Sequence, residues 1–157
     1  MAALHFALVA LLAGWLLREQ QARRRRDADF NLIAERDRVQ AAKMAAILQG
    51  MPDGILVVDG DLRLVEWNDR FPELAGVPSG MLRVGLDLSD LLRAQAAAGE
   101  FGPVDVDAEV ERRMTLLRSG GSTGVIERVR PNGKVLEVRC SPLPEGGFVT
   151  LYTDVSA

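Results

Sequence analysis

The N-terminal segment, residues 2–17, constrains this chain most, because its sixteen residues carry no formal charge and are almost all apolar. As a helix it would span roughly 24 Å, less than the ~30 Å hydrocarbon core of a bilayer. Met1, local thinning and snorkelling by Arg18 would make up the difference. Trp15 lies near its end, where an indole favours the membrane interface. We therefore expect residues 1–17 to form a single transmembrane anchor.

Positive charge follows this segment at once, with Arg18 and then a run of four arginines at positions 23–26. Because arginine and lysine stay on the cytoplasmic side of a membrane, they predict an outer N-terminus and an inner remainder of the chain. Two alternatives stay open. A cleaved signal peptide would carry a basic region before its apolar core, and an interfacial helix would have a polar face. The segment has neither.

The second region, residues 18–49, contains no proline or glycine and is rich in Ala, Arg, Glu and Gln, so we expect a helical linker. One stripe follows alternating steps of three and four, which favours a coiled coil between two parallel copies. The alternative is a single amphipathic helix that packs on the next domain. The stripe consists of Phe30, Ile33, Asp37, Gln40, Met44, Ile47 and Met51.

From residue 50 the chain changes character, because Gly50, Pro52 and Gly54 interrupt the helix and turn signals then separate short apolar runs. The sequence around Asp59-Gly60-Asp61 predicts a hairpin turn, and Pro131-Asn132-Gly133 and Gly146-Gly147 predict two more. We expect strands at residues 55–58, 62–67, 124–130, 134–143 and 148–155.

Between the second and third strands the spacing of apolar residues predicts helices. Asn68 can cap a short helix that ends near Gly76, and residues 86–98 and 105–118 have helical spacing. Gly120 and Gly121 end the last helix. Two strands, several helices and three strands are typical of an α+β domain with an antiparallel sheet, here residues 50–157. The expected inward residues are Leu88, Leu91, Leu92, Val110, Met114 and Leu117.

Two stretches of this domain resemble the PAS family, a sensory fold of bacterial signalling proteins. MPDGILVVDGDLRLVEWNDRFPELAGVP, residues 51–78, is similar to its opening, and ERVRPNGKVLEVRCSPLPEGGFVTLYTDVS, residues 127–156, to its last three strands. The final Asp154-Val155-Ser156 matches the Asp-hydrophobic-Thr/Ser ending of many members. The resemblance, closest to PAS domains beside histidine kinases and cyclic-dinucleotide enzymes, implies a five-stranded antiparallel sheet with helices on one face and room for a small molecule.

The resemblance also implies three structural or signalling residues. Asn68, which follows Trp67 at the end of the second strand, would tie that strand to the next helix through its amide; an ordinary N-cap is the alternative. Asp154 would lie where an output helix begins, and would cap that helix or pair with a basic residue. A kinase or cyclase follows this boundary in many members. We therefore expect a free-standing module or the input part of a longer signalling protein.

The positions of histidine and cysteine in the sequence limit which cofactors of the PAS family this chain could bind. Haem-binding members use a histidine on the helix before the last three strands, but His5 in the anchor is the chain's one histidine. Members that form a flavin–cysteine adduct have a cysteine just after the Asn of the helical segment, whereas Cys140 lies in the expected penultimate strand. Histidine-ligated haem and covalent flavin are therefore not supported, and the cofactor is unknown. Non-covalent flavin, or haem held by Met114 or Cys140, stays open.

Catalytic and metal sites are not indicated. The one histidine, His5, lies in the expected anchor and leaves none for a Ser-His-Asp triad in the domain. A single cysteine excludes a cysteine-rich zinc site, and no P-loop is present. We interpret Cys140 as a buried apolar thiol. Glu109 and Glu111 are two apart on a helix and do not share a face. The remaining charges of the final hairpin form an expected solvated cross-strand ladder: Glu127, Glu137, Arg128, Arg130 and Arg139.

These observations predict a PAS-type sensor for signal transduction, as in two-component systems, anchored in the bacterial inner membrane with its domain in the cytoplasm. The expected partners are a second copy, a signalling kinase or cyclase, and a small-molecule ligand. Nucleic acid is not expected, because the net charge is −3. The alternative is a PAS domain that binds no ligand and serves dimerisation or protein interaction.

Overall fold

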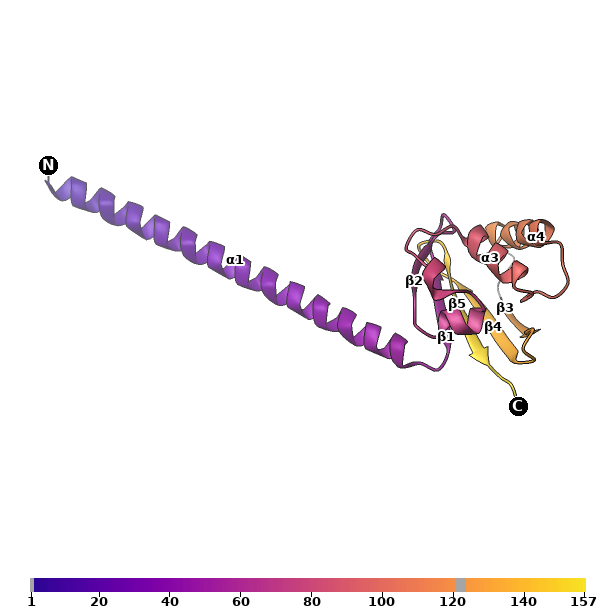
Figure 1. Cartoon of the computed structure of the whole chain (residues 1–157). Helices are drawn as coiled ribbons and strands as arrows, with labels where there is room; N and C mark the ends of the chain where they lie inside the picture. Colours follow the sequence, from indigo (N-terminus) through magenta and orange to yellow (C-terminus); the bar gives the residue numbers. More distant parts are fainter. Residues whose placement is uncertain (1, 121–123) are drawn as a thin grey trace. The chain divides into compact units, whose positions relative to one another are not determined.

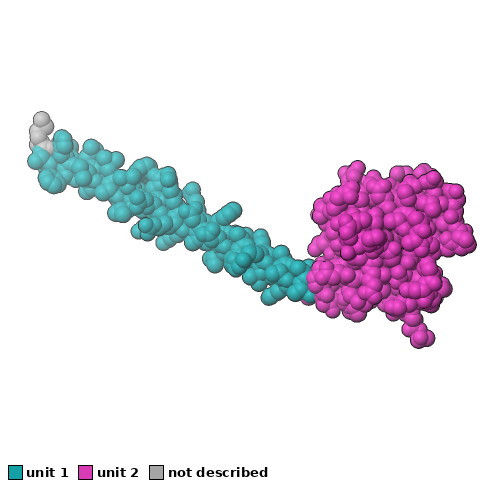
Figure 2. Space-filling view, in the orientation of Figure 1, with its two compact units in different colours: residues 1–46 teal, residues 47–157 magenta. Residues whose placement is uncertain are grey.

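The structure, a computed structural model, describes residues 2–120 and 124–157. It contains two compact units, Met1–Ala46 and Ile47–Ala157 (Figure 2). Among the described residues, every buried apolar side chain belongs to the second unit. A fragment that includes residues 47–157 therefore keeps a complete hydrophobic core of its own.

Helix α1 (Ala2–Gly50) runs without a break through both regions that the sequence assigns to an anchor and a linker. None of its described side chains is buried. By length and hydropathy, α1 contains one candidate membrane span near the N-terminus. The helix ends at Gly50 because Pro52 disfavours helical geometry in the residue before it and lacks a backbone donor.

The second unit is built on a five-stranded antiparallel sheet with the strand order β2-β1-β5-β4-β3 (Figure 1). The last strand lies in the middle of the sheet and pairs with the first, Leu56 opposite Thr150. The predicted antiparallel α+β fold is thereby confirmed. The strands are β1 (Gly54–Val58), β2 (Leu64–Trp67), β3 (Gly124–Val129), β4 (Val135–Pro142) and β5 (Phe148–Asp154).

Strand β2 begins at Leu64 and not at residue 62, because the preceding turn is longer than predicted. The carboxylate Oδ1 of Asp59 accepts hydrogen bonds from the backbone N–H groups of Asp61 and Arg63, at 2.9 and 3.0 Å. Leu62 has a φ of 58°, in the left-handed region, which no strand accommodates. The ends of the other strands differ from the prediction by one residue.

The two longer helices of the domain begin at capping aspartates. Helix α3 starts at Leu88 and not at residue 86, because Asp87 is its N-cap and accepts from the N–H of Ser89 at 2.9 Å. Asp105 likewise caps α4 through the N–H of Ala108. Gly120 follows α4 with a φ of 69°, whereas Gly121 lies outside the described residues. The helices are α2 (Phe71–Ala75), the unpredicted 3₁₀ helix η1 (Ser79–Met81), α3 (Leu88–Ala97) and α4 (Val106–Arg118).

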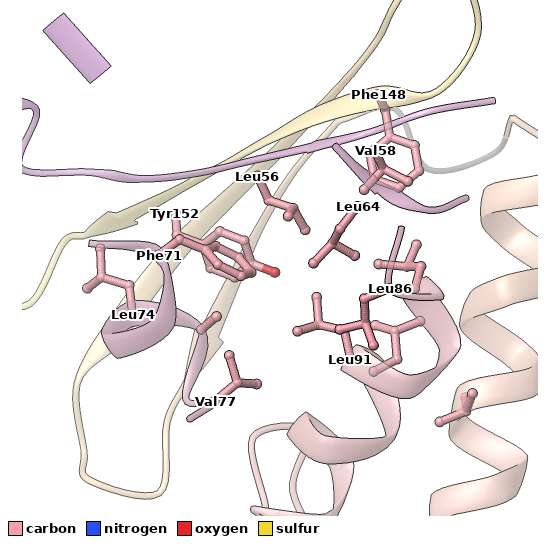
Figure 3. Packing of buried hydrophobic residues seen from close by; sticks show 14 of the residues in the cluster. Leu56, Val58, Leu64, Phe71, Leu74, Val77, Leu86, Leu91, Phe148 and Tyr152 are labelled. Atoms are coloured by element: carbon pink, nitrogen blue, oxygen red, sulfur yellow. The ribbon is translucent and has the colours of Figure 1, made fainter. Parts of the chain in front are cut away.

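The core lies between these helices and one face of the sheet, where Leu56, Val58, Phe148 and Tyr152 meet residues of α2 and α3 (Figure 3). The edge of the Phe71 ring meets the Tyr152 ring at a centroid distance of 5.4 Å. Burial of the predicted inward residues is confirmed for all but Leu117, which is half-buried: Leu88, Leu91, Leu92, Val110 and Met114.

Candidate functional site

A cavity of about 450 Å³ lies between the sheet and helices α3 and α4. Most of its wall is aliphatic, and a few polar side chains interrupt this lining. Its volume and its composition are those of a small-molecule site, for which ~300–1,000 Å³ is typical. The aliphatic lining is Leu56, Leu88, Leu91, Leu92, Leu116, Leu117, Val125, Ile126 and Val138, and the polar lining includes Gln95, Arg112, Arg113, Thr150 and Tyr152.

Paired residues of β3 and β4 form part of the cavity wall. Gly124 and Ile126 of β3 lie opposite Cys140 and Val138 of β4, and all four line the cavity. Because successive side chains point to opposite faces, Arg128 is the next residue of β3 on the same face as Ile126. The inner face of β3 thus changes from apolar to cationic within one step.

Tyr152 and Gln95 form the buried polar part of the lining. The Gln95 side chain is 1% exposed, and its Nε2 donates to the carbonyl of Ala75 at 2.9 Å. Burial raises the pKa of Tyr152, against smaller opposing effects from Arg128 and a hydrogen bond with Gln95. The Tyr152 hydroxyl is therefore protonated at neutral pH and able to donate.

Glu100 is held by two arginines, one from β3 and one from the turn after it. The Arg130 guanidinium donates to both carboxylate oxygens of Glu100, with an Nη2–Oε1 distance of 2.9 Å. Nη2 of Arg128 lies 3.7 Å from Oε2, an ion pair beyond hydrogen-bond distance. The side chains are 5% exposed for Glu100, 9% for Arg130 and 11% for Arg128. Arg128 and Arg130 are thus not part of the predicted solvated ladder, because they point toward the core.

A second carboxylate, Glu109 of α4, binds the two arginines of the cavity wall. It accepts from Nη2 of Arg112 at 2.6 Å and from Nε of Arg113 at 2.7 Å. The hydrogen bond with Arg112, and then that with Arg113, lowers the pKa of Glu109. Cζ of Arg113 also lies 3.6 Å from the centroid of the Phe101 ring, a cation–π contact.

Asn68 connects three segments of the second unit. Its Oδ1 accepts from the N–H of Ile55 at 3.0 Å and of Phe71 at 3.2 Å. Its Nδ2 donates to the carbonyls of Leu48 and Asp53, at 2.9 and 2.8 Å. The side chain therefore joins the last turn of α1 to the start of β1 and the start of α2. The N-cap position of α2 is Arg70, whose side chain makes no capping bond.

The other predicted residues lie apart from one another. Trp67 ends β2 and is half-buried against the core. Asp154 ends β5, where its carboxylate lies 3.4 Å from Nζ of Lys134 and accepts from the N–H of Ser156. The hydrogen bonds with Ser156 lower the pKa of Asp154. Cys140 is half-buried and not fully buried as predicted, because it lines the cavity.

The sequence-based interpretation overlooked the buried cluster of Gln95, Glu100, Phe101, Arg113, Arg128 and Arg130. The period of two along β3 carried part of the signal, since it places Arg128 on the face of Ile126. No local pattern pointed to Glu100, which follows α3 in a turn. The predicted pairing of Glu127 with Glu137 is confirmed by the strand register. Within the part of the chain described, no group of three or more His, Cys, Asp or Glu side chains could hold a metal ion.

Comparison with known protein families identifies the family of this chain. Residues 48–157 match the family model described as the PAS fold. The match covers more than half of the chain, and the chain therefore belongs to the PAS fold family. No curated protein sequence matches it significantly.

Several solved structures are similar at low identity. The PAS domain of an HTR-like protein from Haloarcula marismortui is 21% identical, with a TM-score of 0.46 over 75% of this chain and 99% of that one. A domain of a sensory box histidine kinase/response regulator from Geobacter sulfurreducens is 21% identical, with a TM-score of 0.45 over 73% and 94%. The PAS domain of BvgS from Bordetella pertussis is 16% identical, with a TM-score of 0.48 over 75% and 88%.

Proposed function

We propose that this chain is a membrane-anchored PAS sensory module that binds a small molecule in the cavity between its sheet and helices α3 and α4. The observation that carries the proposal is the cavity itself: about 450 Å³, walled by aliphatic side chains, with a few polar groups at fixed positions. Such a site binds by burial of apolar surface and orients its ligand by hydrogen bonds. We assign no catalytic step to the chain.

Asn68 offers a route from the cavity domain to the linker. It binds both the α1 carbonyl of Leu48 and the N–H of Ile55 in β1, and Leu56, the next residue of β1, lines the cavity. A ligand that shifts β1 would change the geometry of the hydrogen bond that holds the end of α1. Such a ligand shifts the population of linker states by its differential affinity for them.

The proposed location is the inner membrane, with the PAS domain in the cytoplasm. The uncharged residues 2–17 would be the span, and the four arginines at 23–26 would keep the following residues inside. In this setting the module would be the input part of a histidine kinase or a related signalling protein, or a partner of one.

A second candidate function is a PAS dimerisation or protein-interaction module that binds no ligand. It is favoured by the apolar residues of the α1 stripe, Phe30, Ile33, Met44 and Ile47, which are 58–73% exposed. Exposed apolar residues at this spacing pair two helices, and both candidates accommodate such a dimer.

Native mass spectrometry of a fragment with residues 27–157, purified without refolding, separates the two candidates. The fragment lacks the anchor and keeps the whole second unit. A mass above that of the polypeptide identifies a retained small molecule and supports the sensor. A bare mass, together with no thermal stabilisation by any compound of a metabolite library, contradicts it and favours the interaction module.

A further inference from the structure

We propose that the ligand of this cavity is an organic acid with an apolar chain, whose carboxylate binds the guanidinium of Arg128. This inference rests on the ligand-binding function proposed above and adds the chemical class of the ligand. Three features carry it: the two donors of Arg128 that make no hydrogen bond, the contact of this side chain with Tyr152 of the cavity wall, and the charge of its surroundings.

The first feature is the set of N–H donors on the Arg128 guanidinium. Nε and Nη2 of Arg128 are buried and have no hydrogen-bond partner in the described structure. The nearest carboxylate, Glu100, is already bound by Arg130 through both of its oxygens. A buried charged group without hydrogen bonds costs several kcal/mol, and such groups normally have a partner. Nε and Nη2 lie on the same edge of the guanidinium, the fork that binds the two oxygens of one carboxylate side by side.

The second feature is the position of Arg128, which lies next to residues of the cavity wall. Arg128 follows Ile126 by two residues on the inner face of β3, and Ile126 lines the cavity. Its Cζ lies 5.9 Å from the centroid of the Tyr152 ring, and Tyr152 is also part of the wall. Arg128 itself is not one of the lining residues, so a carboxylate on its fork would lie just beyond Tyr152, with its chain in the cavity along the leucine, isoleucine and valine side chains.

The surroundings favour an anion. Together with Arg112, which is exposed, and Glu109, the buried cluster brings four guanidiniums and two carboxylates to this region: Arg112, Arg113, Arg128, Arg130, Glu100 and Glu109. In formal charge these six side chains have two positive charges more than negative ones. Burial lowers the pKa of Arg128, against the opposing effects of Tyr152 and Glu100, and the charges of Arg113 and Arg130 act in the same direction as burial. One bound carboxylate would neutralise part of this surplus and supply the missing acceptors.

The test compares three probes on the 27–157 fragment by isothermal titration calorimetry: decanoate, decanol and acetate. Decanol has the same chain without the charge, and acetate has the charge without the chain. We expect decanoate to bind about 10- to 100-fold more tightly than decanol, the range of hydrogen bonds to a charged group, and acetate to bind weakest.

The variant Arg128→Met tests whether Arg128 binds the carboxylate. It keeps most of the side-chain volume, and Glu100 keeps its bonds with Arg130, so we expect the variant to fold. Its preference for decanoate over decanol should disappear. Arg139→Met, an exposed arginine of β4, is the matched control and should keep the preference. If Arg128→Met does not fold, Arg128→Lys replaces it; lysine keeps the charge but not the fork, and the preference should fall at least about threefold.

The outcomes separate this inference from the proposed function. Equal affinity for decanoate and decanol overturns the acid while leaving a ligand-binding cavity. A preference for decanoate that persists in the Arg128 variant overturns the assigned residue. If no probe binds but native mass spectrometry finds a retained neutral molecule, the acid is overturned and the sensor stands. If no probe binds and the mass is bare, both are overturned.

Discussion

Asn68 is 1% exposed, yet both ends of its amide are fully used, since the oxygen accepts two hydrogen bonds and the nitrogen donates two. An apolar residue of similar size would leave the N–H of Ile55 and the carbonyls of Leu48 and Asp53 without these bonds. At the scale of single residues, a buried amide thus fixes the junction of α1, β1 and α2 more firmly than any exposed ion pair can.

Replacing Asn68 by alanine should lower the free energy of unfolding of the 27–157 fragment by about 2–4 kcal/mol, because buried backbone groups lose their partners. Urea denaturation measures this change. Asn68→Asp keeps an acceptor but loses both donors, and we expect an intermediate loss. Asn132→Ala, in the exposed turn between β3 and β4, is the control and should cost about 1 kcal/mol or less. Equal losses at positions 68 and 132 would contradict the junction role.

We expect Glu109 to make the stability of the domain depend on pH in the acid range. Its pKa in the folded state is lowered below the ordinary value of 4.5, mainly by Arg112. A lowered folded-state pKa means that the stabilisation is complete above the unfolded-state pKa and is lost as the pH falls through the folded-state pKa. Stability should therefore decrease from about pH 5 downward, and less steeply in Glu109→Gln.

Denaturant titrations at several pH values measure this dependence. Glu111→Gln, two residues away on an exposed part of α4, is the control and should keep the slope of the unaltered fragment. A Glu109→Gln variant with an unchanged slope would show that the pairs with Arg112 and Arg113 do not contribute to stability.

At the scale of elements, the domain depends on the close approach of α2 to the first strand. A Cβ added to Gly54 would lie 2.9 Å from Cα of Phe71, a backbone atom that cannot rotate away. Phe71 is fully buried and packs on Tyr152 of β5. The glycine at the start of β1 therefore sets how closely α2 can cover the sheet.

Gly54→Ala should destabilise the fragment by about 1–3 kcal/mol, since α2 must move to admit the methyl group. Thermal unfolding followed by circular dichroism measures the loss. Gly80→Ala, in η1, meets nothing within 4 Å and should change stability by no more than about 0.5 kcal/mol. A tolerated Gly54→Ala would mean that α2 is free to shift.

At the scale of the whole molecule, α1 is a long helix none of whose described side chains is buried. Its apolar side chains are exposed from the N-terminus to Ile47, and the uncharged part is distinct from the stripe between Phe30 and Ile47. We propose that the first meets lipid and the second meets another copy.

Ile33→Lys should weaken dimerisation of the 27–157 fragment at least about tenfold, because it places a charge in the helix seam. Sedimentation equilibrium measures the dissociation constant. Leu32→Lys changes an equally exposed neighbour that lies off the stripe, and it should leave the dimer intact. A monomeric 27–157 fragment, or equal effects of the two substitutions, would rule out this seam.

Deleting residues 1–17 should release the protein from membranes, because the remaining chain keeps the arginines at 23–26 but loses the apolar span. Fractionation followed by a high-salt wash separates insertion from electrostatic adsorption. The full chain should resist the wash and the deletion variant should not. Salt-resistant binding of the deletion variant would contradict the anchor.

The sequence by itself determined the features that depend on neighbours along the chain. Apolar spacing and the absence of Pro and Gly predicted helix over residues 18–49, and alternation with Gly and Pro turns predicted the five strands and their hairpins. The order of these strands and helices predicted an antiparallel sheet, and the family resemblance, which rested on the same local signals, implied the same fold. An N-cap role of Asn68 was expected because an asparagine precedes a predicted helix, and its link between strand and helix was implied by the family resemblance.

Only the tertiary structure decided which side chains meet across the fold. Glu100 becomes a buried carboxylate because the turn after α3 brings it beside Arg128 and Arg130, about thirty residues later in the chain. The end of α1 lies within reach of Asn68 because the chain returns to it after β2. Contacts between distant segments depend on the packing of whole elements, which no local spacing encodes, and the cavity with its cationic end is one of them.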